Sequence, residues 1–112
     1  MDKRFKPLTT IEELDVRRAL LDDIDAHPGR PVPEVIRLVR TTLRFTIAEY
    51  AKLCGVSARG LQDIEREVKS PTLDTVGKLL RPLGLRVGVV TRDAVTRAEA
   101  ALAAHTKERA KQ

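Results

Sequence analysis

Apolar residues recur at helical intervals along most of this chain, and the pattern predicts a mainly helical protein. The first predicted helix covers residues 10–27, with Thr10 and Glu13 as a capping box at its start. Its apolar face is expected to carry Ile11, Leu14, Leu21 and Ile24. Prolines and a glycine over residues 28–33 then break the pattern, and Pro33 suits the first turn of a second, densely apolar helix.

Residues 45–73 predict two short helices joined by a tight turn and followed by a charged loop. Thr46 and Glu49 can form a capping box at the start of the first helix. Gly55 can end that helix because glycine tolerates a positive φ. The residues expected to face inward on it are Ala48, Ala51 and Leu53.

Ser57 is placed to cap the second helix of this pair. Leu61 and Ile64, spaced i, i+3, are expected to face the core. The opposite, mostly polar face carries Ala58, Arg59, Gln62, Asp63 and Arg66. Two helices that cross through small residues in this way form a helix-turn-helix, which can place its second helix in the major groove of DNA.

A further helix is predicted from Pro71 to Leu83, where Gly84 ends it. Residues 85–89 then change to a period of two, which predicts one short strand. A single strand needs a pairing partner, and the same strand of a second chain is the economical one. The expected dimer contact comprises Leu85, Val87, Gly88 and Val89.

The tail from residue 93 has high helix propensity but few residues to bury, so we expect a frayed helix or a segment that orders on binding. The 112 residues suffice for one modest core with terminal appendages. We expect a helical appendage over residues 1–29, a helix-turn-helix domain with its strand over 30–92, and a helical or disordered tail over 93–112.

The charge is concentrated on the middle of the chain. Between Arg30 and Arg92, Lys and Arg number twelve and Asp and Glu six, so this part carries +6, against +5 for the whole chain. The segments before and after it carry −2 and +1. Positive charge on the part that contains the helix-turn-helix favours a phosphate partner, although many small proteins are basic without one.

No chemistry of an enzyme is visible in the sequence. The chain has no Gly-rich phosphate loop and no nucleophile with a suitably spaced base. We interpret Asp22, Asp23 and Asp25 as a solvated helix face rather than a general acid and base. His27 and His105 stand apart from other potential ligands, so no metal or other cofactor is expected.

Cys54 is the one cysteine, which excludes an internal disulfide and suits a reducing compartment. We expect its side chain in the core, at the inward end of a helix. No apolar run approaches the ~20 residues that cross a bilayer, and the N-terminus lacks the apolar segment of a signal peptide. A cytoplasmic protein without a membrane partner is therefore expected.

From about Val35 to Leu85 the chain resembles the Xre-type helix-turn-helix domain, the phage lambda repressor-like fold of five short helices. The resemblance rests on Leu-Cys-Gly-Val-Ser at 53–57, Ile-Glu-Arg at 64–66 and Ser-Pro-Thr-Leu at 70–73. It implies a DNA-binding transcriptional regulator. The strand after Leu-Gly-Leu is similar to that of HipB-like antitoxins, in which such a strand pairs across a dimer axis.

The resemblance also implies roles for individual residues. Arg40 and Glu65 match family positions that pair between the first helix and the end of the recognition helix, so a structural ion pair is expected. Ile47 stands where most members have a Gln that binds a DNA phosphate. Glu67 stands where a Gly commonly allows a left-handed exit. These two departures bear on the affinity for DNA and on the geometry of the loop.

Arg59 is the main candidate for a base contact, because a guanidinium can bond guanine O6 and N7 together; a phosphate contact is the alternative. Ala58 could pack on a thymine methyl group, and Gln62 lies on the same face. Asp63 could accept a hydrogen bond from cytosine N4, or it could hold Arg59 or Arg66 in place.

Lys69 and Ser70, just before the next helix, suit phosphate by charge and by free backbone donors, unless they form only a solvated loop.

The leading hypothesis is a sequence-specific DNA-binding transcriptional repressor, a homodimer on a palindromic operator, which acts as the antitoxin of a toxin-antitoxin module that autoregulates its operon. The alternatives are a stand-alone phage or metabolic regulator, and a protein-interaction module that neutralises a toxin with DNA binding secondary.

Overall fold

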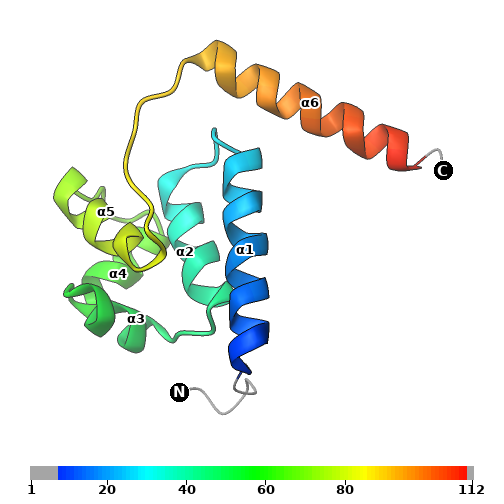
Figure 1. The fold of residues 1–112 in the computed structure, drawn as a ribbon. Coiled ribbons are helices and arrows are strands. Elements are labelled where there is room, and N and C mark those ends of the chain that lie inside the picture. The colour runs from blue at the N-terminus through cyan, green and yellow to red at the C-terminus, as the bar shows by residue number, and fades with distance from the viewer. Residues whose placement is uncertain (1–7, 111–112) are drawn as a thin grey trace.

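A computed structural model describes residues 8–110 of the chain, and the predicted mainly helical fold is confirmed (Figure 1). The described helices are α1 (Thr10–Ala26), α2 (Val32–Thr42), α3 (Ile47–Cys54), α4 (Ala58–Glu65), α5 (Leu73–Leu80), the 3₁₀ turn η1 (Arg81–Leu83) and α6 (Arg92–Ala110). The helices α2 to α5 with η1 form the expected five-helix unit, and α1 is the additional N-terminal helix. Figure 1 shows α1 and α2 antiparallel and adjacent, with α3, α4 and α5 gathered beside them.

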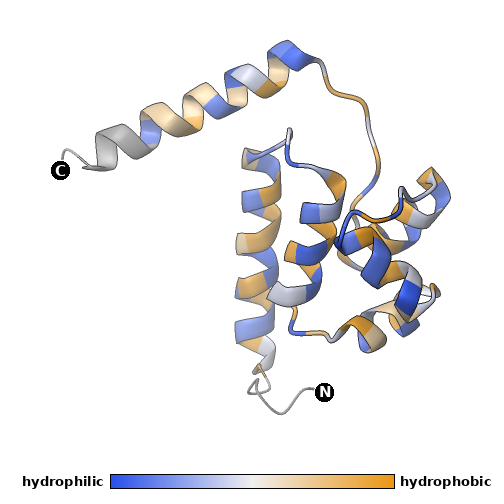
Figure 2. Cartoon of the chain, turned by 180° about the vertical axis from the view of Figure 1, so that it is seen from behind, coloured by the Kyte–Doolittle hydropathy of each residue, from blue (hydrophilic) through white to orange (hydrophobic). Residues whose placement is uncertain are grey.

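The core is aliphatic, with one aromatic side chain at its centre. Tyr50 of α3 is fully buried, and its hydroxyl donates a hydrogen bond to the Leu79 carbonyl of α5. The other buried apolar residues are Leu20, Ile36, Val39, Ala51, Leu61, Ile64, Val76, Leu79, Leu80 and Leu83. Figure 2 shows that such apolar positions recur along α1 to α5.

The sequence located the buried face of α4 correctly, whereas the expected faces of α1 and α3 are correct only in part: Leu21, Ile24 and Ala51 pack in or against the core, but other expected residues do not. On α3, Tyr50 faces the core, whereas Ala48 and Leu53, both expected inside, are exposed. On α1, Leu20 is buried, whereas Ile11 and Leu14 are 73% and 60% exposed. The reason in both helices is that the neighbouring elements cover only part of the apolar stripe.

The start of α1 also differs by one residue from the expected capping box. Thr9, rather than Thr10, is the N-cap, and the backbone N–H of Glu12 donates to its hydroxyl oxygen over 3.2 Å. Either threonine is a suitable cap by sequence. The caps of the helix-turn-helix are confirmed, because Thr46 and Glu49 form the capping box of α3.

The same hydrogen-bond pattern ends α2, α3, α4 and η1, with Arg44, Gly55, Glu67 and Gly84 in left-handed conformations. At each end the left-handed residue donates to the carbonyl three positions earlier, and the next residue donates to the carbonyl five positions before it, over 2.9–3.3 Å. This is the Schellman motif, for which glycine is the residue of least strain. Arg44 and Glu67 adopt the conformation at a cost of about 1–2 kcal/mol each.

The helix α1 is fastened to the rest of the domain at two places. The Arg17 guanidinium donates to the Pro82 carbonyl of η1 over 2.8 Å. At the other end, the Asp23 carboxylate pairs with Arg30, before α2, at 3.0 Å. Together with the buried Leu20, these contacts favour a packing role for α1 over a free appendage.

The segment between η1 and α6 contains no regular secondary structure in this single described chain, although apolar positions recur along it (Figure 2). The strand expected over residues 85–89 is therefore not formed here, because a strand needs a neighbour with which to form its ladder. The dimer pairing itself stays a prediction.

The tail forms the helix α6, which extends away from the domain (Figure 1). Its first turns approach the link between α1 and α2 so closely that a Cβ on Gly29 would lie 2.5 Å from the Val95 side chain. A glycine is thus needed for this approach. Among the described helices, none has the length and apolar character that crossing a bilayer requires.

Candidate nucleic-acid interface

The turn between α3 and α4 fixes the direction of α4. Gly55 adopts a left-handed φ of 75°, and the Ser57 hydroxyl then accepts a hydrogen bond from the Gly60 backbone N–H over 2.9 Å. Leu61 and Ile64 of α4 are buried, as the spacing predicted. The opposite face of α4 is consequently turned toward solvent, where a DNA groove could receive it.

Five of the seven residues expected at DNA surround one shallow hollow between α3 and α4. They are joined there by Ile47 and Ala48 from the start of α3, which sequence reasoning did not include among the contacts. The hollow is lined by Ile47, Ala48, Ala58, Arg59, Gln62, Asp63 and Arg66. Three of the lining residues, Ile47, Ala48 and Ala58, are apolar, and the other four are polar or charged. The apolar character of Ile47 and Ala48 at the start of a helix was the signal that could have identified them.

The carboxylate of Asp63 forms no ion pair with Arg59 or Arg66 in the described part of the chain. Its backbone carbonyl instead accepts hydrogen bonds from the Val68 and Lys69 N–H groups, at 3.0 and 3.4 Å, and so closes the end of α4. The side chains of Arg59 and Arg66 are therefore available on the exposed face of α4.

Lys69 and Ser70 lie outside this hollow, in the exposed loop between α4 and α5. Glu67 occupies the same loop and is also exposed. Its φ of 60° shows that the left-handed exit is made without glycine. The departure at Glu67 therefore keeps a left-handed residue at this position and adds a negative charge to the loop that contains Lys69.

Arg40 and Glu65 are brought together at the C-terminal end of α4. The Arg40 Nε and Nη2 atoms donate to the two carboxylate oxygens of Glu65 over 2.7 and 2.9 Å. A further nitrogen of Arg40 donates to the Phe45 carbonyl over 2.9 Å, and Arg37 donates to the Glu65 backbone carbonyl. Among the described side chains no buried polar atom lacks a partner.

The four residues expected at a dimer contact lie on the segment after η1. Leu85 is partly buried against the core, while Val87 and Val89 are 46% and 101% exposed. Two further apolar residues that sequence reasoning did not include, Leu73 and Val90, are also exposed. The signal for them was their apolar character at positions with no internal packing partner.

No chemistry of a metal site or nucleophile emerges from the geometry. Across residues 8–110, no three His, Cys, Asp or Glu side chains come together as metal ligands would. Burial raises the pKa of the Cys54 thiol, an effect partly offset by a hydrogen bond with Tyr50. A thiol with a raised pKa is a poor nucleophile. Cys54 is partly rather than fully buried, so its expected core position is only half correct.

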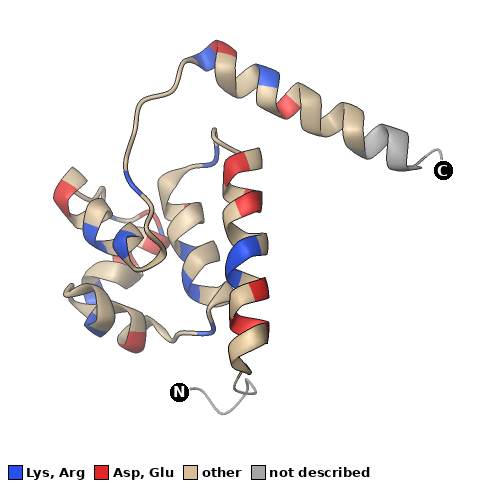
Figure 3. Cartoon of the chain, in the orientation of Figure 1, with Lys and Arg blue, Asp and Glu red and all other residues tan. Residues whose placement is uncertain are grey.

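Figure 3 shows acidic residues recurring along α1, whereas several basic residues lie on α2, α4 and α5.

Comparison with protein families gives one match, to a family described as helix-turn-helix, over residues 36–90. Neither the curated proteins nor the solved structures searched contain a match to this chain. The match spans α2 from Ile36 through the segment after η1, and it indicates DNA binding and transcription regulation. Residues 36–90, which include α3 and α4, are therefore similar to the helix-turn-helix family.

Proposed function

We propose that this protein is a sequence-specific transcriptional repressor in which α4 is the recognition helix. The observation that carries the proposal is the exposed face of α4 over the hollow shared with α3, on a helix-turn-helix segment. Arg59 is assigned to a guanine, and Ala58 with Ile47 to a neighbouring thymine methyl group. Gln62, Asp63 and Arg66 complete the contact surface on α4.

Electrostatics support the same face. The part from Arg30 to Arg92 carries a net charge of +6. Lys69 and Ser70 in the following loop are assigned to backbone phosphates, which fix the register of α4 but carry no sequence information. Ile47 cannot supply the phosphate contact that a Gln would make there, so the remaining cations carry more of the affinity.

We infer a homodimer formed through residues 85–89. The support is the exposed Val87 and Val89 on a segment whose backbone lacks ladder partners within the described chain. Antiparallel pairing about a two-fold axis would give each strand a neighbour and bury these apolar side chains. Two recognition helices about 34 Å apart would then read half-sites one helical turn apart on a palindrome.

The finer assignment is an antitoxin that represses its own operon. The support is indirect: the strand resembles that of HipB-like antitoxins, and α6 extends from the domain as a surface that a toxin could bind (Figure 1). A stand-alone phage or metabolic regulator uses the same DNA-binding face without a protein partner. Co-expression with the product of the adjacent gene, followed by co-purification, separates these two functions.

The test of DNA binding is selection from a random duplex pool followed by titrations over a range of salt concentrations. A palindromic consensus is expected, and log K should fall with log salt at a slope of about −0.9 per phosphate contacted. Lys69→Ala should reduce that slope by about one unit, whereas Arg59→Ala should remove preference at one base per half-site, worth about 1–3 kcal/mol. Arg97→Ala, on the exposed side of α6, is the matched control that should change neither. Absence of any enriched sequence would refute the proposal.

A further inference from the structure

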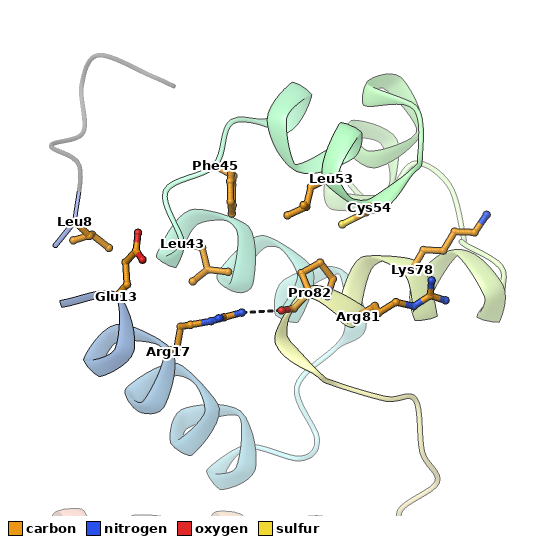
Figure 4. Close-up of a pocket in the computed structure, with 10 residues that line it drawn as sticks. All are labelled: Leu8, Glu13, Arg17, Leu43, Phe45, Leu53, Cys54, Lys78, Arg81 and Pro82. Carbon is orange, nitrogen blue, oxygen red and sulfur yellow. Dashed lines mark hydrogen bonds between the residues drawn. The ribbon is translucent and has the colours of Figure 1, made fainter. Parts of the chain in front are cut away.

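A second, larger pocket lies between α1 and the helix-turn-helix and shares no residue with the hollow beside α4. It has a volume of about 530 Å³ and is enclosed by the start of α1, the link from α2 to α3, the end of α3, and the α5–η1 corner (Figure 4). Pockets of roughly 300–1,000 Å³ with mostly apolar walls are typical of small-molecule sites. The ten lining residues belong to elements far apart in the sequence.

The walls of this pocket are apolar. They are formed by Leu8, Leu43, Phe45, Leu53, Cys54 and Pro82. Leu53 is 55% exposed, and no described side chain fills the space in front of it. The Arg17 guanidinium reaches across to the Pro82 carbonyl and ties α1 to η1 at one side of the pocket (Figure 4).

The charges around the pocket are unequal and are separated along it. Lys78 and Arg81 lie on the Cys54 side of the pocket, with their charged ends directed outward at its rim, whereas Glu13 lies at the opposite end, near Leu8, and Arg17 lies between them on the Pro82 carbonyl (Figure 4). Lys78 has only an exposed contact with Asp74 at 3.5 Å. The Arg81 side chain makes no ion pair with any residue in the described range. An anionic group is therefore favoured at the Lys78 end and disfavoured at the Glu13 end.

We propose that this pocket binds an amphipathic organic anion, with an extended apolar body against Leu43, Phe45 and Leu53 and a carboxylate at the outer rim, where it meets Lys78 and Arg81. Burial of the ligand's apolar body against the walls provides affinity, and the two cations determine which end of the ligand lies at the rim.

Cys54 provides a direct reporter, because its thiol lines the pocket and the chain contains no other cysteine. The experiment measures the rate of Cys54 alkylation by N-ethylmaleimide in the full chain, at a mildly alkaline pH that offsets the raised pKa of the thiol and at increasing concentrations of decanoate below its micellar range. Decyltrimethylammonium is the matched probe with the same apolar body and the opposite charge. Decanoate is expected to slow alkylation in a saturable manner, and decyltrimethylammonium to have at least tenfold weaker effect.

Variants at exposed pocket positions test the geometry without disturbing the core. Arg81→Gln should weaken decanoate protection by about tenfold, because a charge-assisted contact is lost. Leu53→Glu should reverse the preference between the two probes. Lys52→Gln and Arg86→Gln, which remove a cation outside the pocket, are the controls and should leave both probes unaffected.

Three results would overturn the proposal. The first is no protection by decanoate, and the second is equal protection by both probes, which would leave only an apolar groove. The third is alkylation that is already slow without any probe and that Phe5→Ser accelerates, which would make the chain's own N-terminal segment the occupant. None of these outcomes depends on DNA, so they test the pocket independently of the proposed repressor function.

Discussion

Arg40 of α2 holds the carboxylate of Glu65 at the end of α4 by two hydrogen bonds, of 2.7 and 2.9 Å. The Glu65 side chain is only 5% exposed and that of Arg40 only 15%. Because the same guanidinium also donates to the Phe45 carbonyl, it joins α2, the approach to α3 and the end of α4. The pair therefore fixes the orientation of α4, and it lies apart from the exposed face proposed to contact DNA.

Removing one partner of this pair should be more damaging than removing both. Glu65→Ala leaves the buried Arg40 without its counter-charge and should lower the free energy of unfolding by about 3–5 kcal/mol. The double variant Arg40→Met/Glu65→Leu should lose less stability than the single variant Glu65→Ala, and so less than the sum of the two single variants, as measured by urea unfolding. Additive losses would mean that the two side chains are energetically independent.

Glu67 combines backbone strain with an unfavourable charge, and two substitutions separate these effects. Glu67→Asn removes the charge and tolerates the left-handed φ of 60°, whereas Glu67→Gln removes only the charge. The Asn variant should be about 1 kcal/mol more stable to urea than the Gln variant. Both should bind DNA more tightly than the parent, and by similar factors, since the charge effect is common to them. Equal stability of the two variants would argue against strain at this position.

The apolar residues Ile47, Ala48 and Ala58 in the hollow beside α4 predict sensitivity to a single methyl group. Replacing the contacted thymine of the selected operator by uracil removes only the 5-methyl group, and it should weaken binding by about 1 kcal/mol. Ile47→Gln should abolish the difference between the two DNAs while adding a phosphate contact. Measurement is by fluorescence anisotropy with otherwise identical duplexes. Tight binding that does not change with uracil would refute the methyl contact but not the proposed DNA binding.

Tyr50 predicts a loss of stability at alkaline pH. Burial is the main cause that raises its pKa above the value of about 10 expected in the unfolded chain. The neutral hydroxyl thus stabilises the fold fully below about pH 10, and this contribution falls by about 1.4 kcal/mol per unit as pH rises above that value. Tyr50→Phe should lower the free energy of unfolding by about 1 kcal/mol at neutral pH, because a hydrogen bond is lost. In the variant, the loss of stability that the parent shows above about pH 10 through ionisation of Tyr50 should be absent.

Urea unfolding of the parent and Tyr50→Phe proteins at a series of alkaline pH values provides the measurement. Tyr50 is the one tyrosine in the chain, and tryptophan is absent, so tyrosinate absorbance reports this residue alone. Titration of that absorbance at an ordinary pKa in the folded protein would contradict the buried environment.

The dimer prediction is tested within residues 85–89. Val87→Pro removes a backbone donor from the middle of the expected strand and should give a monomer by light scattering, with helical circular dichroism unchanged. Operator affinity should fall greatly because each monomer reads one half-site. Val87→Thr retains the N–H group and the β-branched shape, so it should remain dimeric. A Val87→Pro protein that stays dimeric would place the interface elsewhere.

The features that the sequence alone determined are local ones. Thr46 with Glu49, Ser57 and Gly55 set the ends of α3 and the start of α4 through hydrogen bonds within about one helical turn. Such bonds depend on residue type and spacing, which the sequence contains in full. For the same reason, the polar face of α4 could be predicted residue by residue from the spacing of Leu61 and Ile64.

Only the tertiary structure decided how much of each apolar stripe is covered. The periodicity of α1 and α3 is compatible with several faces, and packing selected Leu20 and Tyr50 while leaving Leu14 and Leu53 exposed. Coverage depends on where neighbouring helices end and at what angle they cross, which no residue encodes by itself. The pocket at Leu53 arises in the same way, because α1 is anchored to the domain through its C-terminal half and Arg17 and so leaves space beside its first turns.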